Sequence, residues 1–256
     1  MPVVIKYGGN AMTDDATRAA VAAEIRALFD AGEQPAVVHG GGPFISAALD
    51  AAGLPHRFER GLRVTTPESL DVIERVLTVL SKRLAQDIGP AIGLSGRDAG
   101  LLTGEPRGPS LGRVGRVTGV NTAALRALTE NGFVPVLACL AVDASGGLLN
   151  VNADEVAAAV AGALAAGVIF LTNVPGVLDE PRRADSVLAT LTRDEAAQRV
   201  ADGRIAGGMI PKVEAAMDAL RQGASYALIA DGRDPRSARD ALNGTGGTRL
   251  VGRDGF

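Results

Sequence analysis

The chain has 256 residues, of which 46% are hydrophobic and 21% charged, and its formal net charge is −3. This is a globular composition that can bury a sizeable core, and its slight acidity offers no electrostatic footprint for nucleic acid or an anionic membrane. One cysteine, Cys139, excludes an intrachain disulfide and a cysteine metal cluster, and only two histidines are present. No apolar run approaches the ~18 residues that span a bilayer, and the N-terminus has no charged signal region. We therefore expect a cytoplasmic protein with no nucleic-acid or membrane partner and no protein-held metal site.

Apolar runs rich in Val and Ile alternate with segments of helical periodicity along the chain. Strands are expected at Val3–Tyr7, Pro35–Val38, Ala91–Leu94, Phe133–Cys139, Val168–Thr172 and Tyr226–Ala230. Helices are expected at Asp15–Ala31, Pro43–Ala52, Pro67–Ile88, Asn121–Glu130, Ala153–Ala165, Arg193–Ala201 and Met209–Gln222. This alternation predicts an α/β fold with a mainly parallel sheet covered on both faces.

Two glycine-rich segments, Arg107–Thr118 and Val142–Val151, break the alternation and predict β-hairpins at one end of the sheet. The nearest thing to a domain boundary is Leu178–Leu191, so the chain is either one large domain or two lobes that share one sheet.

Several helix ends carry their own signals. Thr66 precedes a proline, as an N-cap does, and Thr192–Glu195 and Asn152–Glu155 have the spacing of capping boxes. Gly203 and Gly223 are expected helix stops.

Glycine clusters follow the first two predicted strands, in Lys6–Asn10 and in His39–Pro43. Glycines at such turns let backbone N–H groups converge at a helix N-terminus, which makes an anion site. Glycines that serve only tight turns are the alternative, but two such loops at the carboxyl edge of adjacent strands favour a ligand. Neither loop is a dinucleotide fingerprint, and the chain has no Gly-Lys pair and hence no Walker loop.

Lysine is scarce: the 26 basic residues comprise 23 arginines and the three lysines Lys6, Lys82 and Lys212. Because arginine serves wherever a generic cation suffices, each lysine marks a place where a compact ammonium is needed. Lys6 and Lys212 lie beside glycine clusters, and Lys212 follows Gly207-Gly208 in the first turn of a predicted helix. Such a lysine opposes the helix dipole unless a phosphate is bound there.

Two other side chains admit two interpretations each. Asp154, in the first turn of a predicted helix, either eases the helix dipole or holds the two lysines in place. Arg63, in the loop Gly61–Thr65, is either an ordinary surface arginine or a fork for a substrate carboxylate.

Taken together, these motifs resemble the acetylglutamate kinases of the amino acid kinase family, from Val3 to about Leu250. The resemblance rests on seven motifs in the order of that family: Lys6–Met12, His39–Pro43, Gly61–Thr65, Gly93–Gly96, Leu149–Asp154, Asn173–Leu178 and Gly207–Lys212. It implies a three-layer αβα sandwich with an acyl-amino-acid lobe, residues 1–178, and a nucleotide lobe, residues 179–256. The implied reaction transfers the γ-phosphoryl group of ATP to the side-chain carboxylate of N-acetyl-L-glutamate, an early step of arginine biosynthesis.

The resemblance also implies residue roles. Lys6 and Lys212 would stabilise the transferring phosphoryl group, with Asp154 orienting both. The backbone of Gly8, Gly9, Gly41 and Gly42 would cradle that group, and Arg63 and Asn150 would hold the amino-acid substrate. The nucleotide would contact Asn173, Val174, Pro175, Gly176, Val177, Leu178, Arg204, Ile205 and Ala206, with Mg²⁺ held mainly by its phosphates.

The chain departs from the family at Asn173, where Asp is usual, and at Ala206, where Thr or Ser is common. It begins at its first strand, whereas arginine-inhibited hexameric relatives carry an extra N-terminal helix, so we expect a homodimer without that feedback. The alternatives are a kinase for carrier-protein-linked α-aminoadipate and a non-catalytic amino-acid or nucleotide sensor. Carbamate, aspartate and uridylate kinases would share the fold but not the substrate motifs.

Overall fold

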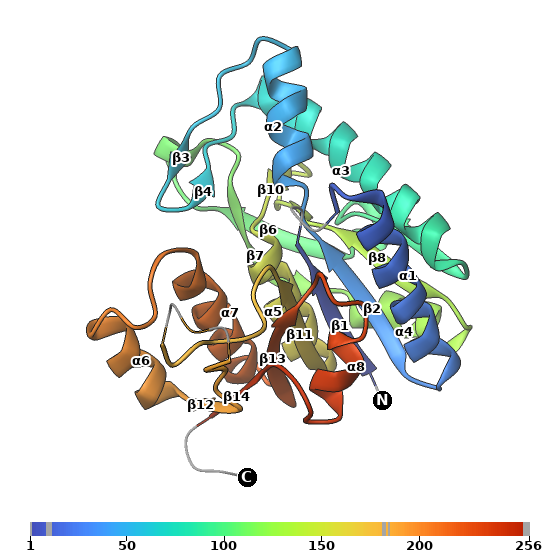
Figure 1. The fold of residues 1–256 in the computed structure, drawn as a ribbon. Helices are drawn as coiled ribbons and strands as arrows, with labels where there is room; N and C mark the ends of the chain where they lie inside the picture. Colours follow the sequence, from blue (N-terminus) through green and yellow to red (C-terminus); the bar gives the residue numbers. More distant parts are fainter. Residues whose placement is uncertain (1, 9–11, 181–182, 184, 253–256) are drawn as a thin grey trace.

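The computed structural model describes residues 2–8, 12–180, 183 and 185–252 (Figure 1). Its centre is an eight-stranded sheet in the order β12-β14-β13-β11-β1-β2-β8-β5, and each neighbouring pair is parallel except β13–β14. The strands are β1 (Pro2–Tyr7), β2 (Gln34–His39), β5 (Ala91–Leu94), β8 (Val134–Ala138), β11 (Gly167–Thr172), β12 (Thr190–Thr192), β13 (Tyr226–Asp231) and β14 (Thr248–Val251). The predicted mainly parallel sheet is confirmed.

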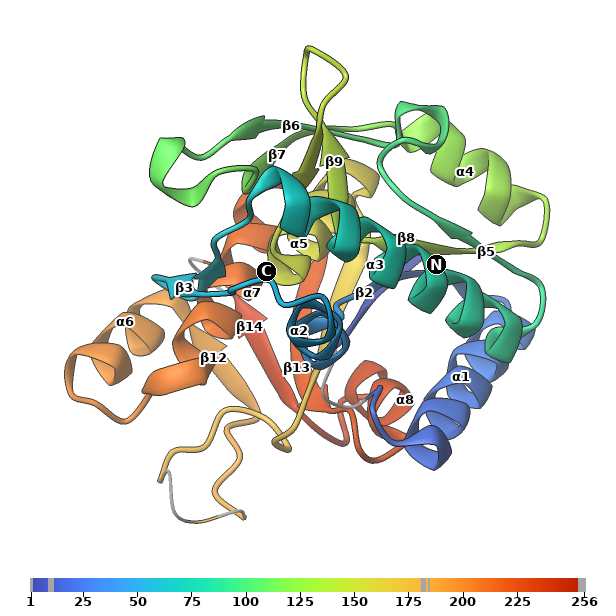
Figure 2. The same cartoon turned by 90° about the horizontal axis from the view of Figure 1, so that it is seen from above.

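Helices cover both faces of this sheet because successive strand residues point to opposite sides. Val3 and Ile5 pack with α1 (Asp15–Asp30), α8 (Ser237–Leu242) and the C-terminal half of α3 (Pro67–Ile88). Val4 and Phe170 pack with α4 (Thr122–Glu130), α5 (Ala153–Leu164) and α7 (Ile210–Arg221). The remaining helices are α2 (Gly42–Ala51) and α6 (Arg193–Ala201). Figures 1 and 2 show the resulting three layers, which confirms the predicted αβα architecture.

The glycine-rich segments take part in hairpins, as predicted, but these hairpins pair with each other and do not extend the main sheet. β6 (Leu102–Pro106) pairs with β7 (Gly115–Val120), and β9 (Leu140–Val142) pairs with β10 (Leu148–Asn150), within a separate four-stranded sheet. A third hairpin, β3 (Phe58–Glu59) with β4 (Leu62–Arg63), lies beyond α2 (Figure 1).

The helix caps were predicted in part. Thr192 and Glu195 form the expected reciprocal capping box at the start of α6. Asn152 caps α5, but the predicted box there is wrong because the carboxylate of Glu155 bonds elsewhere. It accepts from the Val117 N–H at 3.0 Å and from Arg107 Nη2 at 2.5 Å, and so ties α5 to the β6–β7 hairpin.

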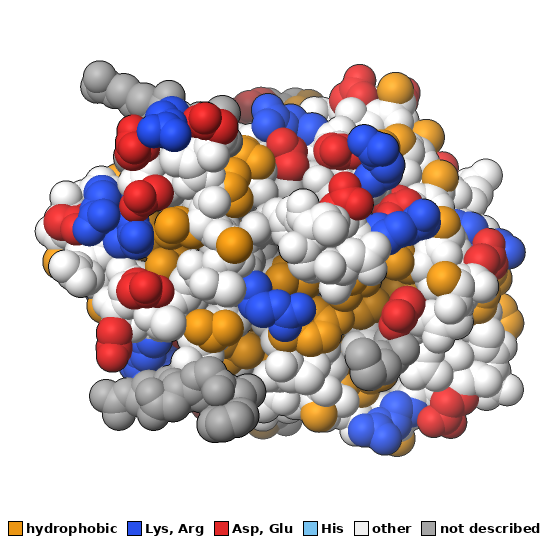
Figure 3. Space-filling view, turned by 60° about the horizontal axis from the view of Figure 1, so that its bottom comes forward, with side chains coloured by type: hydrophobic (Ala, Val, Ile, Leu, Met, Phe, Trp, Pro, Cys, Tyr) orange, Lys and Arg blue, Asp and Glu red, His pale blue; other side chains and the backbone are white. Residues whose placement is uncertain are grey.

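The main sheet runs without a break across the predicted boundary at residue 178, and the division into two lobes stays a prediction. No helix in the described part of the chain is long and apolar enough to cross a bilayer. On the face drawn in Figure 3, acidic and basic side chains alternate around the rim, and hydrophobic side chains gather toward the middle.

Candidate active site

A cavity of about 390 Å³ opens at the carboxyl ends of the central strands. The N-terminal residues of α2 and α5 line it, as do the ends of β1 and β11. Four cationic side chains line it as well, Lys6, Arg63, Lys212 and Arg233, and none of the described lining residues is a carboxylate. Helix N-termini carry partial positive charge, so the cavity favours anionic ligands.

Lys6 and Asp154 form an ion pair inside the wall of this cavity. Lys6 Nζ lies 2.7 Å from Asp154 Oδ1, and both side chains are nearly buried. β1 supplies the lysine near its carboxyl end. The first turn of α5 supplies the carboxylate, and the Asn152 cap fixes that turn by accepting from the Asp154 N–H at 2.8 Å. Asp154 therefore has a specific partner beyond the helix dipole.

Lys212 reaches the same cavity from the first turn of α7, after the short 3₁₀ turn Gly207–Met209. Its Nζ donates to the Gly208 carbonyl at 3.1 Å. Burial lowers the pKa of Lys212; the Asp154 charge opposes this shift and the Lys6 charge adds to it. Lys212 is thus within electrostatic reach of the ion pair, although its own hydrogen bond goes to Gly208.

Lys82, whose role the sequence left open, lies outside this group. It donates from Nζ to the Gly93 carbonyl at 2.5 Å and so ties α3 to β5.

Gly41 and Gly42, in the second glycine loop, are small for different physical reasons. A Cβ on Gly41 would come within 2.8 Å of Leu77 and 3.0 Å of Leu80, so close packing against α3 requires that glycine. A Cβ on Gly42 would meet no described atom within 4 Å, and its φ is not positive. The space beside Gly42 is open to a ligand.

In the first loop, a Cβ on Gly8 would lie 3.7 Å from Lys6 Nζ, which places this glycine beside the ammonium. Gly9 lies outside the described residues. His39 precedes the second loop, and burial lowers its pKa to about 4, so it is neutral at pH 7.

Arg63 is 8% exposed, which contradicts the interpretation as an ordinary surface arginine. Its Nη2 donates to Ser46 Oγ at 2.9 Å and to the Gly42 carbonyl at 3.2 Å, and its guanidinium stacks 4.6 Å from the Phe58 ring centroid. Nη1 is buried and has no partner among the described residues. A buried, unpaired guanidinium nitrogen beside a cavity suits a ligand carboxylate.

Asn150 lines the cavity near Arg63. Its Nδ2 donates to Thr65 Oγ1 at 3.0 Å, and Thr65 Oγ1 donates to the Arg63 carbonyl at 2.8 Å. The structure thus brings the two predicted substrate residues together through one hydrogen-bonded threonine.

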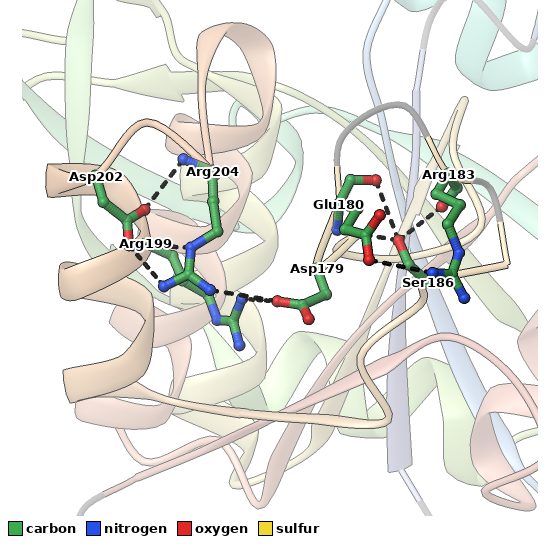
Figure 4. Close-up of polar contacts among 7 residues, drawn as sticks. All are labelled: Asp179, Glu180, Arg183, Ser186, Arg199, Asp202 and Arg204. Carbon is green, nitrogen blue, oxygen red and sulfur yellow. Dashed lines mark hydrogen bonds and ion pairs between the residues drawn. The ribbon is translucent and has the colours of Figure 1, made fainter.

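The two predicted nucleotide segments meet at Asp179 (Figure 4). This residue follows Leu178 directly, and its Oδ1 lies 3.5 Å from Arg204 Nη1 and also pairs with Arg199. Within the first segment, Gly176 packs against Thr248, whose Oγ1 accepts from the Val177 N–H at 2.9 Å. Ile205 is buried, whereas Arg204 and Ala206 are exposed.

Of the nine predicted nucleotide residues, all of which are described, Asn173 alone lines the cavity. The other eight, Val174, Pro175, Gly176, Val177, Leu178, Arg204, Ile205 and Ala206, lie beyond its lining, so their role stays a prediction.

Sequence reasoning missed Arg233, which follows β13 and lines the cavity. The signal was its place just after the Ala-, Leu- and Ile-containing strand, in Asp231-Gly232-Arg233, at the edge where the other loops lie. It also missed Phe58 and Thr172, whose positions at the cavity depend on the tertiary structure.

Comparison with known proteins places this geometry among small-molecule kinases. The sequence profile of the amino acid kinase family matches residues 1–231. An acetylglutamate kinase of Deinococcus radiodurans is 53% identical over 97% of this chain and 100% of its own length. Another, from Gluconacetobacter diazotrophicus, is 42% identical over 92% of this chain and 80% of its own length.

Two solved structures share the fold. The N-acetylglutamate synthase of Neisseria gonorrhoeae, solved with coenzyme A and N-acetyl-glutamate, matches with a TM-score of 0.84 at 26% identity. That match covers 100% of this chain and 60% of the synthase chain. Carbamate kinase from Giardia lamblia, bound to AMP-PNP, matches with a TM-score of 0.71 at 18% identity over 98% of both chains.

The family profile and the curated relatives thus agree with the motifs that line the cavity. The chain belongs to the amino acid kinase family and is a kinase.

Proposed function

We propose that this chain transfers the γ-phosphoryl group of ATP to the side-chain carboxylate of N-acetyl-L-glutamate. The product is N-acetyl-L-glutamyl 5-phosphate, and the reaction is an early step of arginine biosynthesis. The observation that carries the proposal is the cavity itself, in which the Lys6–Asp154 pair and Lys212 share one space with the unpaired Arg63 nitrogen. The acetylglutamate kinases that are 42–53% identical to the chain support the choice of substrate.

Each end of the cavity has its own role in this proposal. Arg63 binds a carboxylate of the amino-acid substrate, and Asn150 donates to or accepts from its amide. Lys6 and Lys212 neutralise charge on the transferring phosphoryl group, and the open space beside Gly42 admits that group to the backbone. Asp154 holds Lys6 and offsets the repulsion between the two ammonium groups.

The chemistry needs no general base. Phosphoryl transfer depends on alignment and charge neutralisation more than on covalent help from the protein. A carboxylate nucleophile is already ionised at pH 7. The neutral, fully buried His39 therefore need not act as a base.

ATP is expected to arrive with Mg²⁺. Among the described residues no group of three His, Cys, Asp or Glu side chains could hold a metal ion, and the nearby Asp154 carboxylate is paired with Lys6. This arrangement fits an ion held mainly by the nucleotide phosphates, which is common for Mg²⁺. When bound, the ion would neutralise charge on the phosphates.

We also propose that the enzyme is a cytoplasmic homodimer. Val79 on α3 is 48% exposed and serves as the test position for a contact between copies. Analytical ultracentrifugation of the chain and of Val79→Glu tests this: a dimer that the substitution dissociates supports the proposal, and a monomeric parent chain contradicts it.

Trapping of the acyl phosphate with hydroxylamine tests the reaction. N-acetylglutamate, glutamate, aspartate and carrier-linked α-aminoadipate are compared as acceptors with ATP. Hydroxamate formation with N-acetylglutamate well above the others supports the proposal. Preference for the carrier-linked acceptor would favour the lysine-pathway alternative, and no hydroxamate with any acceptor would favour a sensor.

A further inference from the structure

Among the cationic side chains that the structure describes at the cavity, Arg233 is the one that the proposed reaction has not used. It follows β13, whose last residue, Asp231, is in register with Thr172 at the end of β11. The Gly232 N–H donates to the Thr172 carbonyl at 2.7 Å, and a Cβ on Gly232 would approach Leu171 to 3.1 Å. This turn packs closely against β11, and Arg233 and Asn173, which follow β13 and β11, both line the cavity.

Asp231 makes a bidentate contact with the guanidinium of Arg233, whose side chain is 61% exposed. Arg233 Nε lies 2.9 Å from Oδ1 and Nη2 lies 2.7 Å from Oδ2, and the Arg233 N–H donates to Oδ1 at 3.0 Å. Arg233 lines the cavity and Asp231 does not. A guanidinium has five N–H donors, so this bidentate contact leaves others for a further acceptor.

The same motif occurs once more, in the second predicted nucleotide segment. In Asp202-Gly203-Arg204 the arginine also bends back on the aspartate, with Nε and Nη2 at 3.0 and 2.6 Å from Asp202 Oδ2 (Figure 4). A short Asp-Gly-Arg turn thus presents an arginine fork in both places. Planar forks of this kind match phosphate oxygens in pairs.

We propose that Arg233 binds the triphosphate of the nucleotide, with Asp231 as the residue that positions it. Arg233 shares the cavity with the two lysines and with the uncharged Thr172 and Asn173. A polyphosphate held by Lys6 and Lys212 in this cavity is the anion that an arginine fork of the same lining would bind. This inference rests on the proposed function, because it takes ATP as the phosphoryl donor.

The chain supplies a matched control for the test. Arg236 lies three residues further on, in Asp234-Pro235-Arg236, and its N–H also donates to the aspartate two residues before it, at 3.0 Å. Its side chain is 77% exposed and does not line the cavity. Arg233→Ala and Arg236→Ala therefore remove the same charge from the same loop.

Isothermal titration with ATP and with adenosine, without any acceptor, measures the effect. Arg233→Ala should weaken ATP binding by about 10-fold or more, the range for a hydrogen bond to a charged group, and leave adenosine binding unchanged. Arg233→Lys keeps the charge without the planar fork, so its ATP affinity should lie between that of Arg233→Ala and that of the parent chain. Arg236→Ala should match the parent chain for both ligands.

Two results would contradict the inference, and a third, separable from them, would contradict the proposed function on which it rests. ATP affinity within twofold of the parent chain in Arg233→Ala would overturn it, even where acyl-phosphate formation proceeds normally. An equal loss for adenosine would also overturn it, because a phosphate contact cannot affect a ligand without phosphate. A parent chain that does not bind ATP would overturn the proposed function itself.

Discussion

Asp154→Asn separates the two interpretations of the Lys6–Asp154 pair. The nitrogen and oxygen are 2.7 Å apart and the side chains are 11% and 14% exposed. At an effective dielectric constant of about 20 the direct attraction is roughly 6 kcal/mol, most of which the desolvation of both charges offsets. Loss of one partner of a buried pair typically costs about 3–5 kcal/mol. Because Asn keeps the size of the side chain and places a neutral amide, not a cavity, beside Lys6, we expect a smaller loss in the free energy of unfolding. It should still exceed the ~0.3–1 kcal/mol of a helix-dipole effect alone.

The same substitution should affect catalysis more than stability. Without the anion, the two ammonium groups repel each other and Lys6 loses its anchor, and misplacement of a catalytic group costs about 100-fold in rate. Asp154→Asn combined with Lys212→Ala should be little worse than Lys212→Ala alone, since both changes act on one unit. The assay is kcat for acyl-phosphate formation in the singles and the double, with denaturant unfolding of each.

Glu155→Gln is the matched control for the helix dipole. Glu155 lies in the same first turn of α5, but its carboxylate pairs with Arg107 and the Val117 N–H. Its kcat should stay near that of the parent chain. A folded Asp154→Asn enzyme with unchanged kcat would refute the reasoning and return this residue to the dipole interpretation.

Three further predictions use the same assays. Lys212→Arg should lower kcat about 10²–10³-fold, because a planar fork cannot replace a compact ammonium. Lys82→Arg, which lies outside the cavity, should leave kcat unchanged. Equal kcat values for the two variants would contradict the role assigned to Lys212. Arg63→Ala should weaken acetylglutamate binding roughly 10–150-fold in titration calorimetry and leave ATP binding intact. Arg57→Ala, at an exposed arginine, should change neither affinity. An equal loss of affinity for both ligands in Arg63→Ala would argue against a carboxylate site. Burial lowers the pKa of Lys212 below 10.5. As the pH rises, Lys212 therefore loses its charge before pH 10.5 is reached, and kcat/KM should decrease with that loss. Asp154 raises that pKa, so Asp154→Asn should move the alkaline limb to lower pH, and an unmoved limb would exclude Lys212 as its source.

Local patterns predicted the elements that a single stretch of sequence determines. The bounds of α3 and α6 agree with the prediction, because proline, capping threonine and glycine define their ends. The strands β12 and β14, the last two at one end of the main sheet, were missed, because at least half of their few residues are polar and neither contains an apolar run. The short helix α8 was missed as well.

The residues of the candidate site also divide into those that a local sequence pattern indicates and those that depend on the tertiary structure. Lys6 and Lys212 could be selected because glycine clusters surround them and lysine is otherwise scarce. Arg233 was not selected, because its place after a strand does not distinguish it among 23 arginines, and its position at the cavity depends on the register between β11 and β13, which brings Asp231 beside Thr172 from 59 positions away. Likewise the partner of Glu155 is a hairpin more than 30 residues earlier, which a rule about helix ends cannot predict.

The scarcity of lysine also has a practical consequence for this enzyme. Lys6 and Lys212 line the cavity, and Lys82 is tied to the Gly93 carbonyl. An amine-reactive reagent therefore meets three ε-amino groups in the chain, and two of them belong to the site. Mass spectrometry of reagent-treated protein, with and without ATP, should report protection of individual amines against almost no background. The scarcity of lysine therefore makes amine modification a selective report on ligand binding at this cavity.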